Sequence, residues 1–417
     1  MRLPRVLLAL LISALAFSGC DRTIGSNPDH DKFSDPKCDS SAIRIQFLVQ
    51  WKSGDVTVER AADIQTFFKE VLVKREKEIV SAEYDRRIYL PEPQGPQFSG
   101  NDVGSTIAEV NWGLHKIEVE SIWPQSVGVG VTVAVVDSGV DIYHQQLKNQ
   151  LYVNSAEQQG KAGIDDDSNG FIDDINGWDF VQNSGTVTDV GQHGTHVAGV
   201  IAAEHIGPGK VMGVAPGAKL LPLNFIDNTR SGTLGNALRA IDYAVQKGAR
   251  VINASWGGIT CSTILQNKIE ELGRRGILFV AAAGNEFSDL DLAPSYPAAY
   301  EFPHQITVGA STQGNLRADF SNFSARLVHL LAPGVDIIST VAPDDSSPSK
   351  GGTSMATPFV SGAAALLFSS RPSATPEQIK NAILQSVDTS DYINEVQSHG
   401  RLNVRKAYEL LNVTAPK

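Results

Sequence analysis

Four apolar runs of strand length, separated by segments with helical periodicity, constrain the fold of this 417-residue chain most strongly. The runs are VTVAVV, KLLPLNF, RVINAS and GILFVAAA, at residues 131–136, 219–225, 250–255 and 276–283. Because the runs are apolar throughout, both faces of their sheet should be buried. Strands that alternate with helices pair in parallel through right-handed crossovers. The sequence therefore predicts an α/β protein with a doubly wound, mainly parallel sheet and helices on both faces.

Polar residues at the ends of these runs indicate where a site should lie. Asp137 directly follows the first run, and Asn285 follows the last. In such sheets, ligands bind beyond the carboxyl ends of the strands. Two other segments carry His193, in HGTHVAG, and Ser354, in GGTSMATP, where a glycine-rich turn leads into a helical pattern. A serine at a helix N-terminus lies where unpaired backbone N–H groups favour developing negative charge.

Asp137, His193 and Ser354 together supply an acid, a base and a nucleophile. Each residue alone would more often be structural, but the combination reverses that expectation. Their order along the chain is that of subtilisin and differs from the two other known orders. The segments VAVVDSGVD, HGTHVAG, FVAAAGNE and GTSMATP resemble those of subtilisin-like serine proteases (subtilases, peptidase family S8) over about 112–411. The resemblance implies a subtilisin-like fold and serine-type endopeptidase activity.

The resemblance also implies a role for each residue. His193 would take the proton from Ser354 and return it to the leaving amine, while Asp137 orients the imidazole. Ser354 would form an acyl-enzyme, and Asn285 would donate to the oxyanion together with the backbone N–H of Ser354. Two alternatives remain open. One is a non-enzymatic surface lipoprotein on an inactive protease scaffold, which the intact catalytic positions disfavour; the other is an esterase or peptide ligase with the same nucleophile.

A substrate-binding cleft is implied in the same way. The segment NASWGG matches the family segment whose exposed edge pairs with the peptide backbone, and residues 230–232 resemble the opposite edge. Ser295 occupies the pocket floor, and because no acid stands there we expect broad specificity for apolar or uncharged P1 side chains. The expected substrate-binding residues are Ser255, Trp256, Gly257, Gly258, Ala282, Ala283, Gly284, Ser295, Ser231 and Gly232.

An acidic loop at residues 163–180 predicts a structural calcium site. Its oxygen ligands alternate before Gly170, as in the opening of an EF-hand loop. Calcium would relieve the repulsion among the carboxylates, and a solvated acidic loop is the alternative. The expected ligands are Asp165, Asp167, Asn169, Phe171, Asp173 and Asp174. We do not expect the second calcium site of the family, because Gln146 stands where an acidic ligand is usual.

The N-terminus predicts export. Two arginines precede a twelve-residue apolar run that is too short to span a bilayer, so residues 1–19 are read as a signal peptide. Small residues before Cys20 resemble a bacterial lipobox, which implies that Cys20 is lipidated and anchors the protein to a membrane of the cell envelope. Secretion after a nearby cut is the alternative. Residues 20–40 are rich in Asp, Ser, Asn and Pro and predict a flexible tether.

Residues 41–97 predict a small α+β domain, with a strand at 43–51, a helix over 58–76 and one or two strands in 78–90. This order resembles the propeptides of subtilisin-like enzymes, which assist folding and then block the site; an unrelated small domain is the alternative. Residues 98–111 are read as a linker that leads to the catalytic domain at 112–413. A maturation cut is expected in the Pro/Gly-rich stretch at 91–102.

The number of cysteines and the net charge limit which partners the protein can have. If Cys20 is lipidated, Cys38 and Cys261 can form a disulfide in an exported protein, although two unrelated thiols are equally consistent with the sequence. A net charge of −11 without a basic stripe argues against nucleic acid as a partner. The expected partners are protein or peptide substrates, the membrane and the protein's own propeptide, which would act as an intramolecular inhibitor on a monomeric enzyme.

Overall fold

The computed structural model describes residues 33–34, 41–91, 110–189, 192–342, 345–346, 349–390 and 393–413. The signal peptide, Cys20, Cys38 and most of the linker lie outside these residues. Within the described part of the chain, no helix has the length and apolar character needed to cross a membrane.

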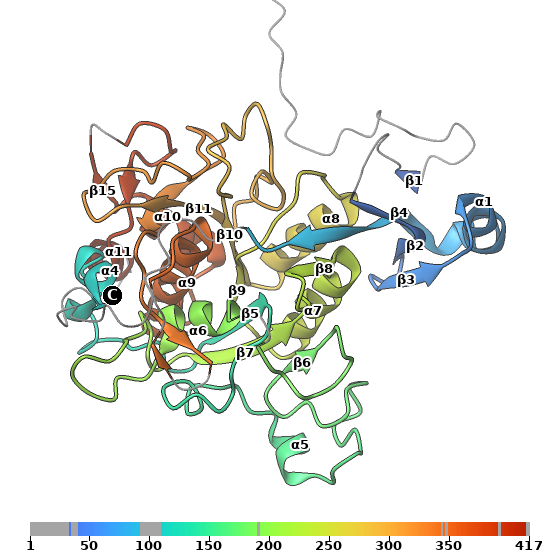
Figure 1. Cartoon of the computed structure of the whole chain (residues 1–417), viewed down its shortest axis with the longest axis horizontal. Coiled ribbons are helices and arrows are strands. Elements are labelled where there is room, and N and C mark those ends of the chain that lie inside the picture. Colours follow the sequence, from blue (N-terminus) through green and yellow to red (C-terminus); the bar gives the residue numbers. More distant parts are fainter. Residues whose placement is uncertain are drawn as a thin grey trace, which may run out of the picture.

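A nine-stranded sheet forms the centre of the larger part of the chain, in the order β15-β16-β12-β11-β10-β9-β5-β7-β6 (Figure 1). All neighbours pair in parallel except β15 and β16, which pair antiparallel. The four apolar runs form the adjacent strands β10, β9, β5 and β7, so the predicted parallel sheet is confirmed. The strands are β5 (Thr132–Asp137), β6 (Trp178–Asp179), β7 (Lys219–Asn224), β9 (Val251–Ala254), β10 (Leu278–Ala282), β11 (Gln305–Ser311), β12 (Leu330–Pro333), β15 (Asp388–Thr389) and β16 (Gly400–Arg401).

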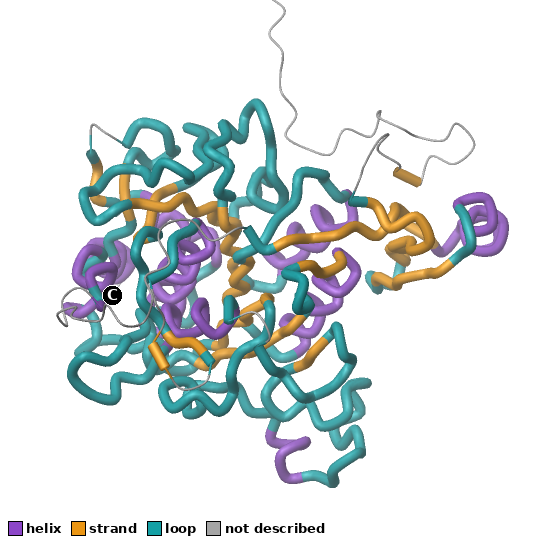
Figure 2. Tube along the Cα trace, viewed as in Figure 1, coloured by secondary structure: helices purple, strands orange, loops and turns teal. Residues whose placement is uncertain are grey.

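Helices cover both faces of this sheet (Figure 2). Side chains alternate along β5, so Val133 and Val135 pack in one core with α6 (Gly194–Ala202) and α9 (Thr353–Ser370). Ala134 and Val136 pack in a second core on the opposite face with α7 (Leu234–Gln246) and α8 (Thr263–Arg274). The remaining elements of this part are α4 (Trp112–Lys116), η3 (Val119–Ser121), α5 (Ser155–Gln159), α10 (Pro376–Leu384), α11 (Val404–Val413), and the small sheet of β13 (Thr340–Val341) and β14 (Asp345–Ser346).

Side-chain caps fix where three of the helices begin. The Thr233 hydroxyl accepts from Asn236 N at the start of α7, and Ser262 Oγ accepts from Leu265 N at the start of α8. Thr375 and Gln378 form a reciprocal capping box ahead of α10, with Pro376 at the first helical position. These caps satisfy backbone N–H groups that have no partner within the helix.

A separate small sheet, drawn in blue in Figure 1, precedes the larger part in sequence and lies beside α7 and α8. Its strands follow the order β1-β4-β2-β3. An aromatic core beneath it stacks Phe47 on Phe67 at 4.1 Å between ring centroids. The elements are β1 (Phe33–Ser34), β2 (Ala42–Trp51), β3 (Val56–Arg60), α1 (Ile64–Phe67), η1 (Phe68–Leu72), α2 (Val73–Arg75), η2 (Glu76–Glu78) and β4 (Ile79–Tyr89).

Two expectations for this region are wrong in detail. The segment 20–40 is not a flexible tether throughout, because Phe33 and Ser34 pair in parallel with Ala82 and Glu83, and Phe33 is buried in the aromatic core. The helix expected over 58–76 begins later, because residues 58–60 pair with β2 as part of β3. Their alternation of apolar and polar residues is a strand pattern that a helical reading overlooks.

Candidate active site

Asp137 and His193 meet at the carboxyl end of β5. Asp137 is the last residue of β5 and is fully buried, and His193 immediately precedes α6. The two side chains are 2.7 Å apart, between His193 Nδ1 and Asp137 Oδ1. Asp137 Oδ1 also accepts from Ser138 N at 2.7 Å. This geometry fixes the imidazole so that Nδ1 faces the carboxylate and Nε2 points away from it.

Asp189 connects the segment after Asp137 with the start of α6, and no sequence pattern pointed to it. Its carboxylate accepts from Ser138 Oγ at 2.8 Å and from Thr195 N at 2.7 Å. Ser138 Oγ in turn accepts from Gly194 N at 3.0 Å. Burial raises the pKa of Asp189, although hydrogen bonds from Thr195 and Ser138 oppose that shift. This network ties the strand that carries Asp137 to the helix that follows His193.

Ser354 is the second residue of α9 and is 2% exposed. Helix α9 packs against α6, which follows His193. The Ser354 hydroxyl donates to Ser255 O at 3.2 Å. Gly352, before the helix, has φ +152°, and a Cβ there would lie 3.3 Å from Asn285 Nδ2 and 3.7 Å from Ser354 N. The absence of a side chain thus keeps open the space between these two nitrogen atoms.

Thr353 orients Asn285. Both Thr353 N and Thr353 Oγ1 lie 2.9 Å from Asn285 Oδ1 and donate to it. Because the amide oxygen is held in this way, the amide nitrogen faces the space in front of Gly352. Thr353 Oγ1 also accepts from Gly284 N at 3.1 Å. Thr353 is a positioning residue that the sequence reasoning did not single out.

A cavity of about 720 Å³ opens beside these residues. Of the residues predicted to bind substrate, Gly257, Gly258, Ala282, Gly284, Ser295 and Trp256 line it. The Trp256 side chain is nevertheless fully buried, and its indole N–H donates to Val136 O at 3.0 Å. Ser255 and Ala283 are also fully buried. Glu286 lines the same cavity, and its carboxylate accepts from Asn322 Nδ2 at 2.7 Å. It was not predicted, because charge was considered only at the position of Ser295.

The end of the small domain runs through this cleft. Strand β4 pairs antiparallel with β8 (Ser231–Thr233), with Ile88 opposite Gly232 and Tyr89 opposite Ser231. On its other side Tyr89 exchanges backbone hydrogen bonds with Gly257, both at 3.4 Å. The predicted edge segments therefore lie on both sides of one extended strand, and that strand belongs to this chain.

Beyond Tyr89 the chain stays in the cleft for two more residues. Leu90 N donates to Arg230 O at 3.1 Å, and the Arg230 guanidinium donates to Pro91 O at 2.7 Å. Residues 230–232 were predicted to form an edge of the cleft, but this side-chain contact of Arg230 was not predicted.

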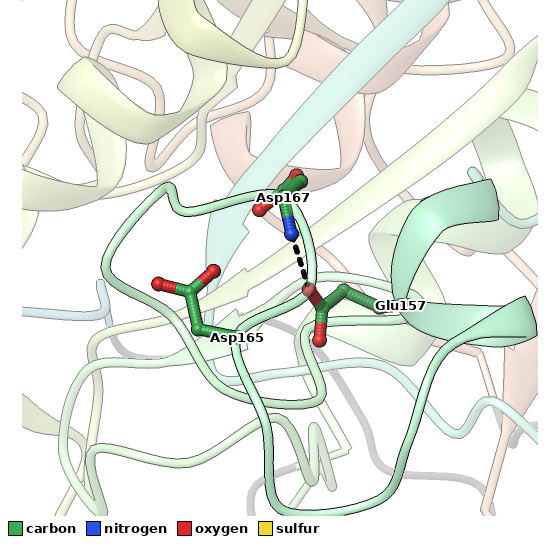
Figure 3. Close-up of side chains that lie close together, drawn as sticks. All are labelled: Glu157, Asp165 and Asp167. Atoms are coloured by element: carbon green, nitrogen blue, oxygen red, sulfur yellow. Dashed lines mark hydrogen bonds between the residues drawn. The ribbon is translucent and has the colours of Figure 1, made fainter.

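The acidic loop brings together a set of carboxylates different from the one expected. One carboxylate oxygen from each of Glu157, Asp165 and Asp167 lies within 4.8 Å of the others (Figure 3). Glu157 comes from α5, before the loop, and was not predicted. Its Oε1 accepts from Asp166 N and Asp167 N at 2.7 and 3.2 Å.

The rest of the predicted ligand set does not join this cluster. Asp174 is fully buried and accepts from Tyr243 Oη at 2.7 Å and from Lys247 Nζ at 2.9 Å. Asp173 accepts from Gly163 N at 2.8 Å, and Asn169 Nδ2 donates to Asp174 at 2.9 Å. The Phe171 ring packs edge-on against Trp178 and Tyr243. Asp174 therefore forms a buried ion pair with Lys247 and is not one of the clustered carboxylates that could bind a cation.

Gln146 occupies the position where the family usually has an acidic calcium ligand. Its side-chain nitrogen donates to Glu204 O at 2.8 Å and to Val211 O at 2.7 Å. N–H donors therefore satisfy these carbonyl oxygens. Elsewhere, Cys261 is disulfide-bonded, which removes the alternative of a free thiol at that position.

Comparison with known proteins agrees with this geometry. The model of the subtilase family, Peptidase_S8, matches residues 128–403. Subtilisin-like protease 1 of Plasmodium berghei is 35% identical over 72% of this chain and 53% of its own length. Thermitase of Thermoactinomyces vulgaris is 33% identical over 76% of this chain and 99% of its own length. The chain belongs to the subtilase family.

The fold is also that of a solved relative. The crystal structure of fervidolysin from Fervidobacterium pennivorans, a keratinolytic enzyme related to subtilisin, superposes with a TM-score of 0.72 at 24% identity. The match covers 90% of this chain and 62% of fervidolysin. The chain spans about half the length of the first Plasmodium relatives that it matches.

Proposed function

We propose that this protein is an exported serine endopeptidase that hydrolyses peptide bonds through Asp137, His193 and Ser354. The observation that carries the proposal is the 2.7 Å contact between His193 Nδ1 and the buried Asp137. Ser354 lies at the N-terminus of α9, which packs against the helix that follows His193. In the reaction, His193 Nε2 removes the proton of the Ser354 hydroxyl as its oxygen attacks the scissile carbonyl. Before this step, the hydroxyl leaves its hydrogen bond with Ser255 O. The imidazolium is stabilised by Asp137 and then protonates the leaving amine.

A phosphonylating reagent directed at activated serines tests this assignment. After removal of the prodomain, one equivalent should attach to Ser354, and the label should disappear when His193 is replaced by alanine. Amide and ester substrates are compared with the same preparation, because an esterase without peptidase activity would cleave only the ester. A folded, processed enzyme that remains unlabelled would contradict the proposal.

Asn285 is the proposed oxyanion donor, with the backbone N–H of Ser354 as the second. Asn285→Ala is expected to lower kcat by about 10²- to 10³-fold with little change in KM, a magnitude taken from subtilisin itself. The reason is that the donor acts on charge that develops only in the transition state. Steady-state kinetics on a peptide substrate measure the effect. Asn403→Ala is the matched control, since Asn403 is a buried asparagine outside the cleft lining whose side chain donates to Asp388 Oδ1 at 3.0 Å; an equal loss of kcat there would argue against a specific role for Asn285.

The cleft is suited to bind an extended peptide by strand addition between β8 and Gly257. Strand β4 already binds in this way, so we propose that residues 88–90 act as a built-in inhibitor until the linker is cut and the strand leaves. Backbone pairing gives affinity without reading side chains, which supports broad specificity. Apolar or uncharged P1 residues remain the proposed preference, with the Glu286 carboxylate engaged by Asn322.

Acidification should tighten the docking of this domain. Burial raises the pKa of Asp85 to about 6, against hydrogen bonds from Gly235 N and Arg86 N, with Glu83 adding to the rise. Asp85 Oδ2 is buried and has no hydrogen-bond partner among the described residues. An exposed aspartate titrates near pH 4, so the docked state holds the proton more tightly than the released state. Its contribution to docking is therefore complete below about pH 4 and is lost as the pH rises through about 6.

The measurement uses a Ser354→Ala chain whose linker has been cut and in which the disulfide of Cys261 has been reduced. Between pH 4 and pH 7 the dissociation constant of the docked domain is expected to rise about ten- to a hundredfold. This corresponds to a difference of about one to two units between the pKa of Asp85 in the docked and released states. Asp85→Asn should flatten this dependence. A dependence that survives in Asp85→Asn would assign it to other groups.

Calcium is the proposed structural cofactor, held by Glu157, Asp165 and Asp167. Two ligands of one Ca²⁺ ion can be about 4.6–5.2 Å apart at most, so the 4.8 Å limit on this oxygen cluster fits the ion. The ion would supply positive charge to the three carboxylates, of which Asp167 also pairs with Lys247 at 3.1 Å. It would take no part in the proton transfers.

Removal of calcium by a chelator is expected to lower the melting temperature by about 5–10 °C. This corresponds to saturation at about a hundred times Kd in a domain of this size. Differential scanning calorimetry with and without chelator measures the shift. Glu157→Gln should abolish most of it, whereas Glu377→Gln, an exposed acid on α10, should leave it intact. An unchanged melting temperature in the unsubstituted protein would contradict the calcium proposal.

We also propose export through the N-terminal signal peptide and attachment to a membrane through lipidated Cys20. Both depend on residues outside the described part of the chain. Mass analysis of the native N-terminus separates a diacylated Cys20 from a secreted, unmodified end.

A further inference from the structure

The disulfide of Cys261 crosses between the two parts of the chain. The chain has three cysteines, so the partner of Cys261 is Cys20 or Cys38. Both precede the small domain, whereas Cys261 directly precedes α8 of the larger part. With either partner, the bond bridges the linker in which a maturation cut is expected.

Strand β1 lies beside the part of β4 that contacts the start of α8. Ser34 lies opposite Glu83 in the β1–β4 pairing. The Glu83 carboxylate accepts from Ser262 Oγ and, at 3.3 Å, from Thr263 N. Ser262 is the next residue after Cys261. Because β1 and β4 are parallel, β1 points along β4 toward the cleft in the larger part.

Chain length favours Cys38 as the partner. Four residues beyond Ser34 span at most about 13–14 Å. Ser34 already lies opposite Glu83, whose carboxylate contacts Ser262, the neighbour of Cys261. Cys20 is separated from Ser34 by a much longer segment, and closing a longer loop costs more entropy. Cys20 is also the residue proposed to carry the lipid.

We propose that a Cys38–Cys261 disulfide keeps the inhibitory small domain attached to the catalytic domain after the linker is cut, so that reduction of the bond controls its release. This inference rests on the proposed protease function and on strand β4 as the inhibitor. A short tether gives the cut domain an effective concentration of about 1 mM. At 10 nM enzyme, this is about 10⁵ times the concentration of an untethered inhibitor. Rebinding of strand β4 is therefore about 10⁵ times more frequent than for an untethered inhibitor.

The releasing reaction requires a dithiol. One of its thiolates attacks a sulfur of the disulfide and displaces the other cysteine as a thiolate, which takes up a proton. The second thiol of the reagent then closes a cyclic disulfide and frees the second cysteine. Two electrons and two protons pass from the dithiol to the protein. Anything bound to the N-terminus, including a lipid on Cys20, remains with the catalytic domain until this step.

The first test does not depend on catalysis. A full-length Ser354→Ala chain with a recognition site for a sequence-specific protease inserted after Asp102 is cut and separated by denaturing electrophoresis. One species is expected without dithiothreitol and two with it. Cys38→Ser and Cys261→Ser should each give two species under both conditions, and Cys20→Ser should behave as the parent. Two species from the parent without reductant would overturn the proposal, and separation in Cys20→Ser instead of Cys38→Ser would overturn the choice of Cys38.

The second test measures activity of the corresponding chain with Ser354 intact, cut at the same site and diluted to 10 nM. The parent should stay latent and gain at least about a hundredfold activity on addition of dithiothreitol, as expected when effective concentration collapses. Cys38→Ser should become active on dilution alone and not respond to the reductant. Full activity of the cut parent without reductant would overturn the proposal. Inactivity of both chains with an intact disulfide in the first test would instead count against the protease function.

Discussion

Ser354→Ala is expected to lower kcat for peptide hydrolysis by about 10⁶-fold, a magnitude taken from subtilisin, a member of the same family. The hydroxyl is the only atom group removed, and it is the proposed nucleophile. KM should change little, because substrate binds by backbone pairing along β8 and Gly257, which the substitution does not touch. Active-site titration and steady-state kinetics on the processed enzyme provide the measurement.

Ser361→Ala is the matched control for this change. Ser361 lies on the same helix, is equally buried and donates to Asn253 Oδ1 at 2.8 Å. Its loss should cost stability of about 1 kcal/mol, as for a typical buried hydrogen bond, while kcat remains within a few-fold. If both alanines reduced kcat equally, the effect would belong to the packing of α9 and not to a nucleophile.

Asp137→Asn is expected to lower kcat by about 10⁴-fold, the size of the loss for the equivalent change in a serine protease of a different family. Asp137 Oδ1 accepts from His193 Nδ1 at 2.7 Å and also from Ser138 N. An amide that places its NH₂ group at the position of Oδ1 would donate to His193 Nδ1 and favour the tautomer with the proton on Nε2, at the cost of the hydrogen bond from Ser138 N. The histidine then lacks the lone pair needed to accept the serine proton. Loss of the negative charge also leaves the imidazolium unstabilised.

The pH dependence of kcat/KM separates this effect from simple misfolding. With Asp137→Asn, the residual activity should rise with pH as hydroxide replaces the histidine base, a response that a destabilised structure would not give. Asp179→Asn is the control, because Asp179 is also a buried acid at the end of a strand of the same sheet, β6, where it accepts from Asn224 Nδ2 at 2.7 Å. Equal losses in the two variants would contradict a special role for Asp137.

The central sheet was predictable because its signals are local and repeated. Strands β5, β7, β9 and β10 are each coded by one uninterrupted apolar run, and the intervening helices carry their own periodicity. The positions of Asp137 and Asn285 follow from the same logic, since both come directly after such a run. Chain order then selected one of several triad arrangements.

Other features depend on contacts between distant segments. Glu157 meets the acidic loop from a helix that precedes it, and its sequence surroundings are those of any exposed helical acid. Asp174 looks like a calcium ligand in sequence, but Lys247 and Tyr243 approach it from α7 and its C-terminal end and turn it into an ion pair. Phe33 appears isolated in a polar segment, and only the aromatic rings of the folded small domain reveal its place.

The amide of Gln146 has a consequence for how this enzyme meets its surroundings. The backbone oxygens of Glu204 and Val211 are joined here by a side chain that is encoded in the chain and cannot diffuse away. This part of the protein is therefore expected to keep its shape in ion-poor media. Sensitivity to the mineral content of the environment is expected instead at the carboxylates of Glu157, Asp165 and Asp167.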